Sequence, residues 1–157
     1  MAELKFEESK NLSIGIELEL QLIHPETYDL SPQINQLLEK TKLIEYAGEI
    51  KPEITHSMVE INSSPHDTID QLYNELFVLN QVIVSQAQKL GILLSGGGVH
   101  PFQNWRERVI FPSYTDVYQK YDFLMKKFTV FGQHVHLGCA NPDDAIYLIH
   151  AFSRYVP

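Results

Sequence analysis

The stretch Ser13-Ile14-Gly15-Ile16-Glu17-Leu18-Glu19-Leu20-Gln21-Leu22 has an apolar residue at every even-numbered position. A period of two is typical of a β-strand, because successive side chains of a strand point to opposite faces of the sheet. The strand is therefore predicted to turn its isoleucines and leucines to one face, and Gly15, Glu17, Glu19 and Gln21 to the other. The two carboxylates then share the polar face.

Two interpretations of this acidic face stay open. Neighbouring like charges raise each other's pKa unless a cation lies between them, and a divalent metal is a common solution. Alternatively, the polar face simply meets water, as in half-exposed antiparallel strands. On these ten residues alone, the solvated face is the simpler interpretation.

Composition narrows the class of protein. The 157 residues are 44% hydrophobic and 20% charged, which is ordinary for one globular domain. A net charge of -8 without a basic cluster argues against a nucleic-acid partner. The first residues lack the apolar run of a signal peptide, and no stretch approaches the roughly 20 apolar residues of a membrane span. With the single cysteine, Cys139, these features predict a cytoplasmic protein with no membrane partner.

Helices and strands are predicted to alternate along the chain. A helix is expected to open at Ser31-Pro32, with Ser31 as its N-cap and Pro32 as its first residue. The clearest helix covers residues 68–90, where Thr68 and Gln71 form a capping-box pattern and Gly91 ends it. Two more helices are expected, over residues 114–128 and from Asn141-Pro142 to the chain end, and further strands at residues 53–62, 92–94 and 130–138.

This order is compatible with a parallel sheet. The clean alternation of the first strand instead favours a sheet with one polar face, which is usually antiparallel. We therefore expect an α+β domain, with helices on one face of a mainly antiparallel sheet and acidic and imidazole side chains on the other.

Two further motifs could join the acidic pair. In His134-Val135-His136 both imidazoles fall on one strand face, although such a pair is often only structural or solvated. Glu60 lies among apolar residues, where an unpaired carboxylate is costly to bury, unless it sits exposed at a strand end. Carboxylate oxygens suit Mg²⁺ or Mn²⁺, and the histidines alone favour Zn²⁺, so Mg²⁺ is the expected metal.

Several motifs together resemble one family. They are Gly15-Ile-Glu-Leu-Glu-Leu-Gln-Leu, Ser57-Met-Val-Glu-Ile-Asn, Gly98-Val-His-Pro-Phe with Trp105 after it, Phe131-Gly-Gln-His-Val-His-Leu-Gly, and Pro142-Asp-Asp-Ala. In order and spacing they resemble the carboxylate-amine ligases of the type 2 glutamate-cysteine ligase group. The resemblance implies a glutamine synthetase-like architecture, in which a curved antiparallel sheet forms a funnel for ATP, metal and amino-acid substrates. It also implies ATP-dependent amide formation through an acyl phosphate.

The resemblance assigns roles to individual residues. Glu17 and Glu19 match the paired acids of the first motif and would hold Mg²⁺ against the nucleotide phosphates, and Glu60 would complete the metal site. His134 and His136 match the Gln-His-Val-His motif, in which the resemblance implies that one contacts metal or phosphate and the other orients it. His100 with Pro101 matches a family turn near the funnel, and a purely structural turn explains this pair equally well.

The chain also departs from the family pattern. Leu18 stands between the glutamates where relatives often carry a third acid, and family members continue well beyond Pro157. The sequence is thus expected to represent the N-terminal part of a ligase domain, spanning residues 1–157. The alternative is a non-catalytic fragment or subunit that binds metal or a partner chain. Both predict association, as a homo-oligomer or with the missing C-terminal half, because an incomplete funnel exposes sheet edges.

Overall fold

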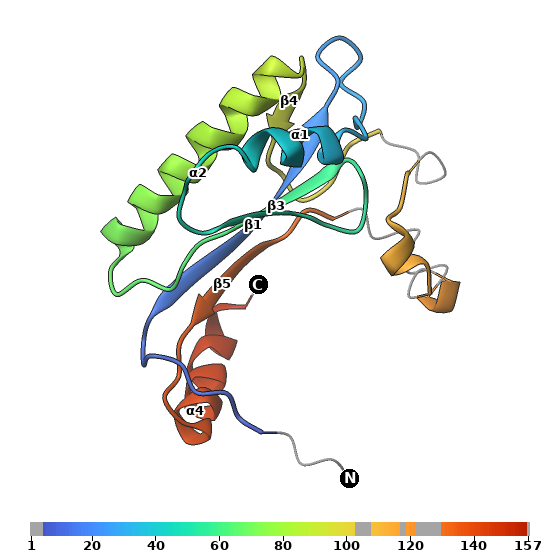
Figure 1. The fold of residues 1–157 in the computed structure, drawn as a ribbon. Coiled ribbons are helices and arrows are strands. Elements are labelled where there is room, and N and C mark those ends of the chain that lie inside the picture. Colours follow the sequence, from blue (N-terminus) through green and yellow to red (C-terminus); the bar gives the residue numbers. More distant parts are fainter. Residues whose placement is uncertain (1–4, 103–107, 117–118, 122–129, 157) are drawn as a thin grey trace.

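A five-stranded sheet forms the centre of the computed structural model, which describes residues 5–102, 108–116, 119–121 and 130–156 (Figure 1). Its strands are β1 (Ile14–Ile23), β2 (Glu49–Pro52), β3 (Met58–Asn62), β4 (Leu93–Ser95) and β5 (Gln133–Leu137). Strand β1 pairs with β3 along one edge and with β5 and then β4 along the other, while β2 pairs with β3. All these pairs are antiparallel, which confirms the sheet type expected from the alternation in β1.

The apolar face of the sheet carries the core. Leu22, Val59 and Ile61 are buried there against α1 (Ile34–Thr41) and α2 (Ile69–Lys89). Helix α4 (Pro142–Phe152) lies beside β5, away from α1 and α2 (Figure 1). It faces the apolar side chains of β5 across an open groove. Helices α1, α2 and α4 thus lie on the apolar side of the sheet, as predicted, and the acidic and imidazole side chains lie on the opposite face.

Two helix ends form as the sequence predicts. The Thr68 Oγ1 atom accepts a hydrogen bond from the Gln71 amide at 3.3 Å, and Gly91 adopts a φ of 68° just after α2. A left-handed φ is accessible to glycine without strain, so Gly91 can end this helix. Asn141 Oδ1 likewise caps α4 by accepting from the Asp144 amide at 2.9 Å. This helix stops at Phe152 and continues only as a 3₁₀ turn, so the helix predicted to run to the chain end was too long.

The predicted start of α1 was wrong. Helix α1 begins at Ile34, and its N-cap Gln33 makes no side-chain capping hydrogen bond. Ser31 is instead tied to the end of β1, because its amide donates to the Leu22 carbonyl at 2.8 Å. A backbone held to a strand in this way cannot yet turn into a helix.

The single strand predicted over residues 53–62 was also too long. Only Met58–Asn62 is strand, and residues 53–57 connect it to β2. Strand β2 itself was not predicted from the sequence. Because β2 and β3 are antiparallel neighbours, the chain must reverse between them. The short strand β4 agrees closely with its prediction, and β5 is shorter than expected at both ends.

Most of the helix predicted over residues 114–128, and Trp105, lie outside the described residues. Pro112–Tyr114 forms a 3₁₀ turn. Among the helices of the described ranges, none has the length and apolar character needed to cross a bilayer.

Candidate metal and nucleotide site

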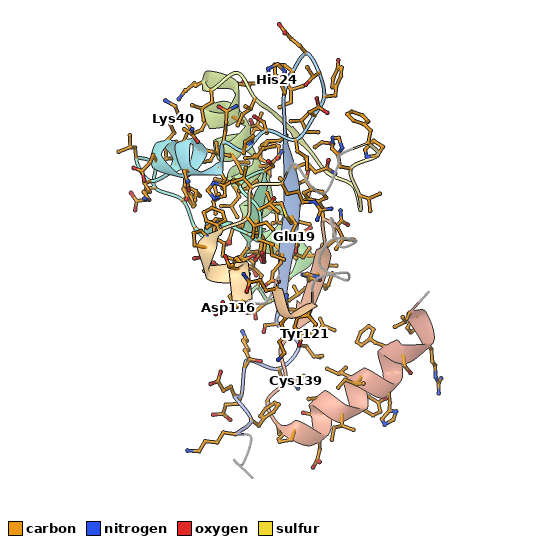
Figure 2. The ribbon with its side chains drawn as sticks, turned by 90° about the vertical axis from the view of Figure 1, so that its right-hand side faces the viewer. Glu19, His24, Lys40, Asp116, Tyr121 and Cys139 are labelled. Carbon is orange, nitrogen blue, oxygen red and sulfur yellow. The ribbon has the colours of Figure 1, made fainter. Side chains whose placement is uncertain are left out.

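A row of charged side chains crosses the polar face of the sheet. Glu19 of β1 stands directly opposite Glu60 of β3, and Glu60 stands opposite Lys51 of β2. Opposed residues on neighbouring strands point to the same face. Figure 2 shows Glu19 near the middle of the β1 ribbon, so this row lies well inside the sheet.

A second row runs parallel to the first, one step along β1. It contains Glu17, which stands opposite Asn62 of β3 and His134 of β5. His136 follows on the same face, opposite Gly15. The strands thus bring the predicted acids and imidazoles to one surface.

The two histidines converge on Glu17. Its Oε2 atom lies 3.2 Å from His134 Nδ1 and 3.3 Å from His136 Nε2. Desolvation raises the pKa of Glu17, but the hydrogen bond with His134 and the charge of His136 outweigh it and lower the pKa overall. Glu17 is thereby kept ionised in a fixed orientation.

Gly132, just before β5, fixes the position of Glu19 through two hydrogen bonds. The Gly132 amide donates to Glu19 Oε2 at 2.7 Å, and the Glu19 amide donates to the Gly132 carbonyl at 3.0 Å. A Cβ atom at residue 132 would lie 2.9 Å from the His134 ring and 3.3 Å from Glu19 Oε1. A larger residue here would therefore displace the His134 ring and crowd the Glu19 carboxylate.

Three carboxylates gather at the first row. Glu19, Glu53 and Glu60 each offer an oxygen, and these oxygens lie within 4.8 Å of one another. Glu60 is 5% exposed, and Glu53 Oε2 is buried without a hydrogen-bond partner among the described residues. Burial, followed by the charges of Glu60 and Glu19, raises the pKa of Glu53. A cation bound among these oxygens would relieve the repulsion between the three carboxylates.

Lys51 brings one positive charge to this cluster. Its Nζ atom lies 2.9 Å from Glu60 Oε1, with the lysine side chain 37% exposed and the glutamate side chain 6% exposed. The hydrogen bond with Glu60 raises the pKa of Lys51 despite some opposing desolvation. Among the ion pairs printed for the described residues, this is the one that reaches the cluster, and it involves Glu60 alone of the three carboxylates.

The acidic cluster fits a hard divalent cation. Such ions prefer carboxylate oxygens, and Mg²⁺ is usually held by one or two carboxylates together with waters and substrate phosphates. Glu53 Oε2 has no competing partner among the described residues, and Glu60 is too buried to be satisfied by bulk water. The chemistry and placement of these residues are therefore suited to Mg²⁺ or Mn²⁺.

The structure divides the predicted site set into two groups. Glu19 and Glu60 belong to the acidic cluster, whereas Glu17 is paired with His134 and His136. Sequence reasoning missed Glu53, Lys51 and Gly132. A signal for Gly132 existed in its position just before the imidazole motif, but the other two depend on the unrecognised strand β2.

A pocket of about 660 Å³ adjoins the second row. It is bounded by Gly15, Glu17 and His136, and by polar residues that include Glu49 and Asn62. Its size is within the range of small-molecule sites. A substrate-sized molecule can therefore lie beside the charged rows.

His100 has a structural contact outside these rows. Its Nε2 atom lies 2.9 Å from the Tyr28 carbonyl oxygen, and its ring meets Phe102 edge-on. His100 thus joins the segment after β4 to the turn after β1.

The sequence of residues 13–157 matches the model of "Glutamate-cysteine ligase family 2". This match covers nearly the whole chain and all the strands that build the charged rows. The chain belongs to glutamate-cysteine ligase family 2.

Curated relatives in glutamate-cysteine ligase family 2 are considerably longer than this chain. A Legionella pneumophila (strain Corby) protein named "Putative glutamate--cysteine ligase 2-1" is 46% identical over 159 residues, covering 100% of this chain and 42% of the relative. A Ralstonia pickettii (strain 12J) protein named "Putative glutamate--cysteine ligase 2" is 48% identical over 154 residues, covering 97% of this chain and 41% of the relative. The chain thus spans about two fifths of these relatives.

A solved structure shares the fold. It is the crystal structure of glutamate-cysteine ligase from Francisella tularensis in complex with AMP, with a TM-score of 0.61 and 19% sequence identity. The match covers 95% of this chain and 31% of the crystallised one. The α+β architecture found in this member of glutamate-cysteine ligase family 2 is therefore that of a known ligase.

Proposed function

We propose that this chain carries the metal- and ATP-binding part of a carboxylate-amine ligase of the glutamate-cysteine type. The observation that supports it best is the meeting of Glu19, Glu53 and Glu60 within 4.8 Å on the polar face of the sheet. Membership of the ligase family and the AMP bound by the structural neighbour support the same conclusion.

The proposed reaction joins a carboxylate to an amine in two steps. An oxygen of the glutamate γ-carboxylate attacks the γ-phosphorus of ATP, and the bond from that phosphorus to ADP breaks. The amine nitrogen of the second amino acid then attacks the resulting acyl phosphate, phosphate leaves, and the nitrogen loses a proton to give an amide. Protein groups contribute mainly by positioning the reactants and by neutralising charge.

Each group on the polar face has a proposed role. Glu19, Glu53 and Glu60 would hold Mg²⁺, with Mn²⁺ as an alternative, and a bound ion would supply positive charge against the phosphates. Glu17 and His134 form a neighbouring position for a second cation or a phosphate oxygen. His136 orients Glu17, because its Nε2 atom contacts the same carboxylate oxygen as His134.

A further polypeptide segment is needed to complete the proposed domain. The groove between β5 and α4 is lined by apolar side chains, and Val135, Ile149 and Tyr155 on it are 63%, 69% and 81% exposed. We propose that residues equivalent to the unmatched part of the relatives, or a second copy of the chain, cover this surface. The substrates are small molecules, and we place the protein in the cytoplasm, where ATP is available.

The exposed groove also supports a second candidate function. In this alternative, the chain is a subunit that binds metal and a partner chain without catalysing amide formation. Both candidate functions include the metal site, but only the ligase catalyses amide formation.

Phosphate release from ATP distinguishes them. The assay contains Mg²⁺, glutamate and a panel of amino-acid amines, with the chain alone and with a polypeptide supplying the remaining portion of a relative. A ligase releases phosphate in an amine-dependent manner, and Glu19→Gln abolishes the release while Glu26→Gln, in the exposed turn after β1, does not. Metal binding without amine-dependent release in either mixture supports the non-catalytic subunit.

A further inference from the structure

Lys51 pairs with a carboxylate that also belongs to the candidate metal site. Its Nζ atom is 2.9 Å from Glu60 Oε1, and Glu60 also belongs to the three-carboxylate cluster. A divalent ion among these carboxylates and an ammonium group on the same carboxylate repel each other strongly at such separations. Full occupancy by both cations is therefore unfavourable unless an anion joins them.

The lysine is free to move away from Glu60, while Glu60 is not. Lys51 lies on β2, which pairs with β3, and its side chain is 37% exposed at the polar face. Its flexible four-carbon stem allows the ammonium to leave without backbone movement. Glu60 lies on the more interior strand β3 and its side chain is 6% exposed.

Two further glutamates attract the Lys51 ammonium to the polar face of the sheet. Glu49 and Glu17 lie near enough to interact electrostatically with the ammonium. A displaced lysine therefore stays near the rows. An anion bridging to the metal would add a stronger partner, because phosphate oxygens accept charge-assisted hydrogen bonds.

We propose that Lys51 is an exchangeable counter-ion, which pairs with Glu60 in the metal-free chain and transfers to a polyphosphate when a divalent metal binds. The inference rests on the proposed function, because it requires the metal site formed by Glu19, Glu53 and Glu60. It adds a residue that couples metal binding to phosphate binding: the metal releases the lysine, and the released lysine helps to hold the phosphates.

The test measures two affinities on the same variants of the chain. Mn²⁺ binding is followed by electron paramagnetic resonance, and Mn²⁺-dependent binding of tripolyphosphate by calorimetry. The variants are Lys51→Met, Lys51→Arg and, as a matched control, Lys42→Met. Lys42 also forms an ion pair, with Glu39 at 2.6 Å, but both of these side chains are exposed to solvent.

Opposite changes are expected for Lys51→Met. Mn²⁺ should bind at least threefold more tightly, because a competing cation is gone, while Mn²⁺-dependent tripolyphosphate binding weakens at least fivefold. Lys51→Arg should retain most of the tripolyphosphate binding, and Lys42→Met should change neither affinity.

Three results overturn the exchange. They are weaker Mn²⁺ binding in Lys51→Met, unchanged Mn²⁺ binding, and unchanged tripolyphosphate binding. If the unsubstituted chain binds Mn²⁺ no better than Glu60→Gln, the proposed metal function fails and the exchange fails with it. Where Lys51→Met folds poorly, Lys51→Gln replaces it, with the Mn²⁺-induced rise in melting temperature as the measurement.

Discussion

Glu19 and Glu60 face each other directly across the β1–β3 pair, on the side of the sheet away from the hydrophobic core. Like charges in this arrangement destabilise a sheet. The fold keeps them together beside Lys51 and adds a third acid, Glu53, from the β2–β3 connection. Because these three carboxylates repel one another, we expect the free energy of unfolding to rise when a cation binds among them.

Removing one of these acids should remove the response to metal. For Glu60→Gln, we expect the rise in melting temperature caused by Mn²⁺ to fall to less than a third of that of the unsubstituted chain. Glu26→Gln, on the exposed turn after β1, is the control and should keep the full rise. Equal Mn²⁺ responses in all three proteins would contradict the metal site.

Glu53→Gln should stabilise the metal-free chain at neutral pH. The pKa of Glu53 is raised by burial and by its acidic neighbours, so the folded chain holds this proton more tightly than the unfolded chain. Stability attributable to Glu53 is therefore present below the carboxyl's ordinary pKa of 4.5 and is lost as the pH rises through the raised value.

The measurement is thermal unfolding in a chelating buffer at pH 7 and pH 4. Glu53→Gln should melt higher than the parent at pH 7, and the two should converge at pH 4. With saturating Mn²⁺ at pH 7 the order should reverse, because the substituted chain loses a ligand. A lower melting temperature for Glu53→Gln at pH 7 without metal would show that Glu53 is stabilised as an anion.

Gly132→Ala should disturb the site and the fold together. The added methyl group would lie 2.9 Å from the His134 ring, so the imidazole must shift from its position beside Glu17. We expect a loss of about 1–3 kcal/mol in the free energy of unfolding. Urea unfolding measures it, with Gly96→Ala as the control because a Cβ there meets no atom within 4 Å. Equal stability of the two variants would remove the argument for close packing at Gly132.

The apolar groove beside α4 should drive association. Ile149 is 69% exposed on it, and we expect the chain to self-associate with increasing concentration unless another segment covers the groove. Ile149→Glu should shift the sedimentation coefficient toward that of a monomer. Leu43→Glu, at an 87% exposed position outside the groove, should not. A monomeric parent chain at all concentrations would contradict self-association through this surface.

Much of the polar face was predictable because strand geometry is local. Once residues 13–22 are recognised as a strand, Glu17 and Glu19 must share a face, and the same argument applies to His134 and His136. That face lies opposite the core, as expected, because alternating leucines and isoleucines leave no other arrangement.

Glu53 and Lys51 could not be found in the same way. Lys51 belongs to the four-residue strand β2, which ends in Pro52 and shows no clear alternation. Glu53 lies in the connection between β2 and β3, where the side-chain direction depends on how the chain reverses rather than on a local period. Because residues 53–62 were predicted to form one continuous strand, the chain reversal between β2 and β3 was not expected.

Anomalous X-ray scattering from Mn²⁺ in crystals of this chain tests the metal site most directly. We predict one strong peak about 2–2.3 Å from carboxylate oxygens of Glu19, Glu53 and Glu60, a range typical of hard-cation ligands. In the same crystals the Lys51 ammonium should have moved away from Glu60. No peak among these three carboxylates at saturating Mn²⁺, or a peak only at exposed acids elsewhere, would show that Glu19, Glu53 and Glu60 do not form a metal site.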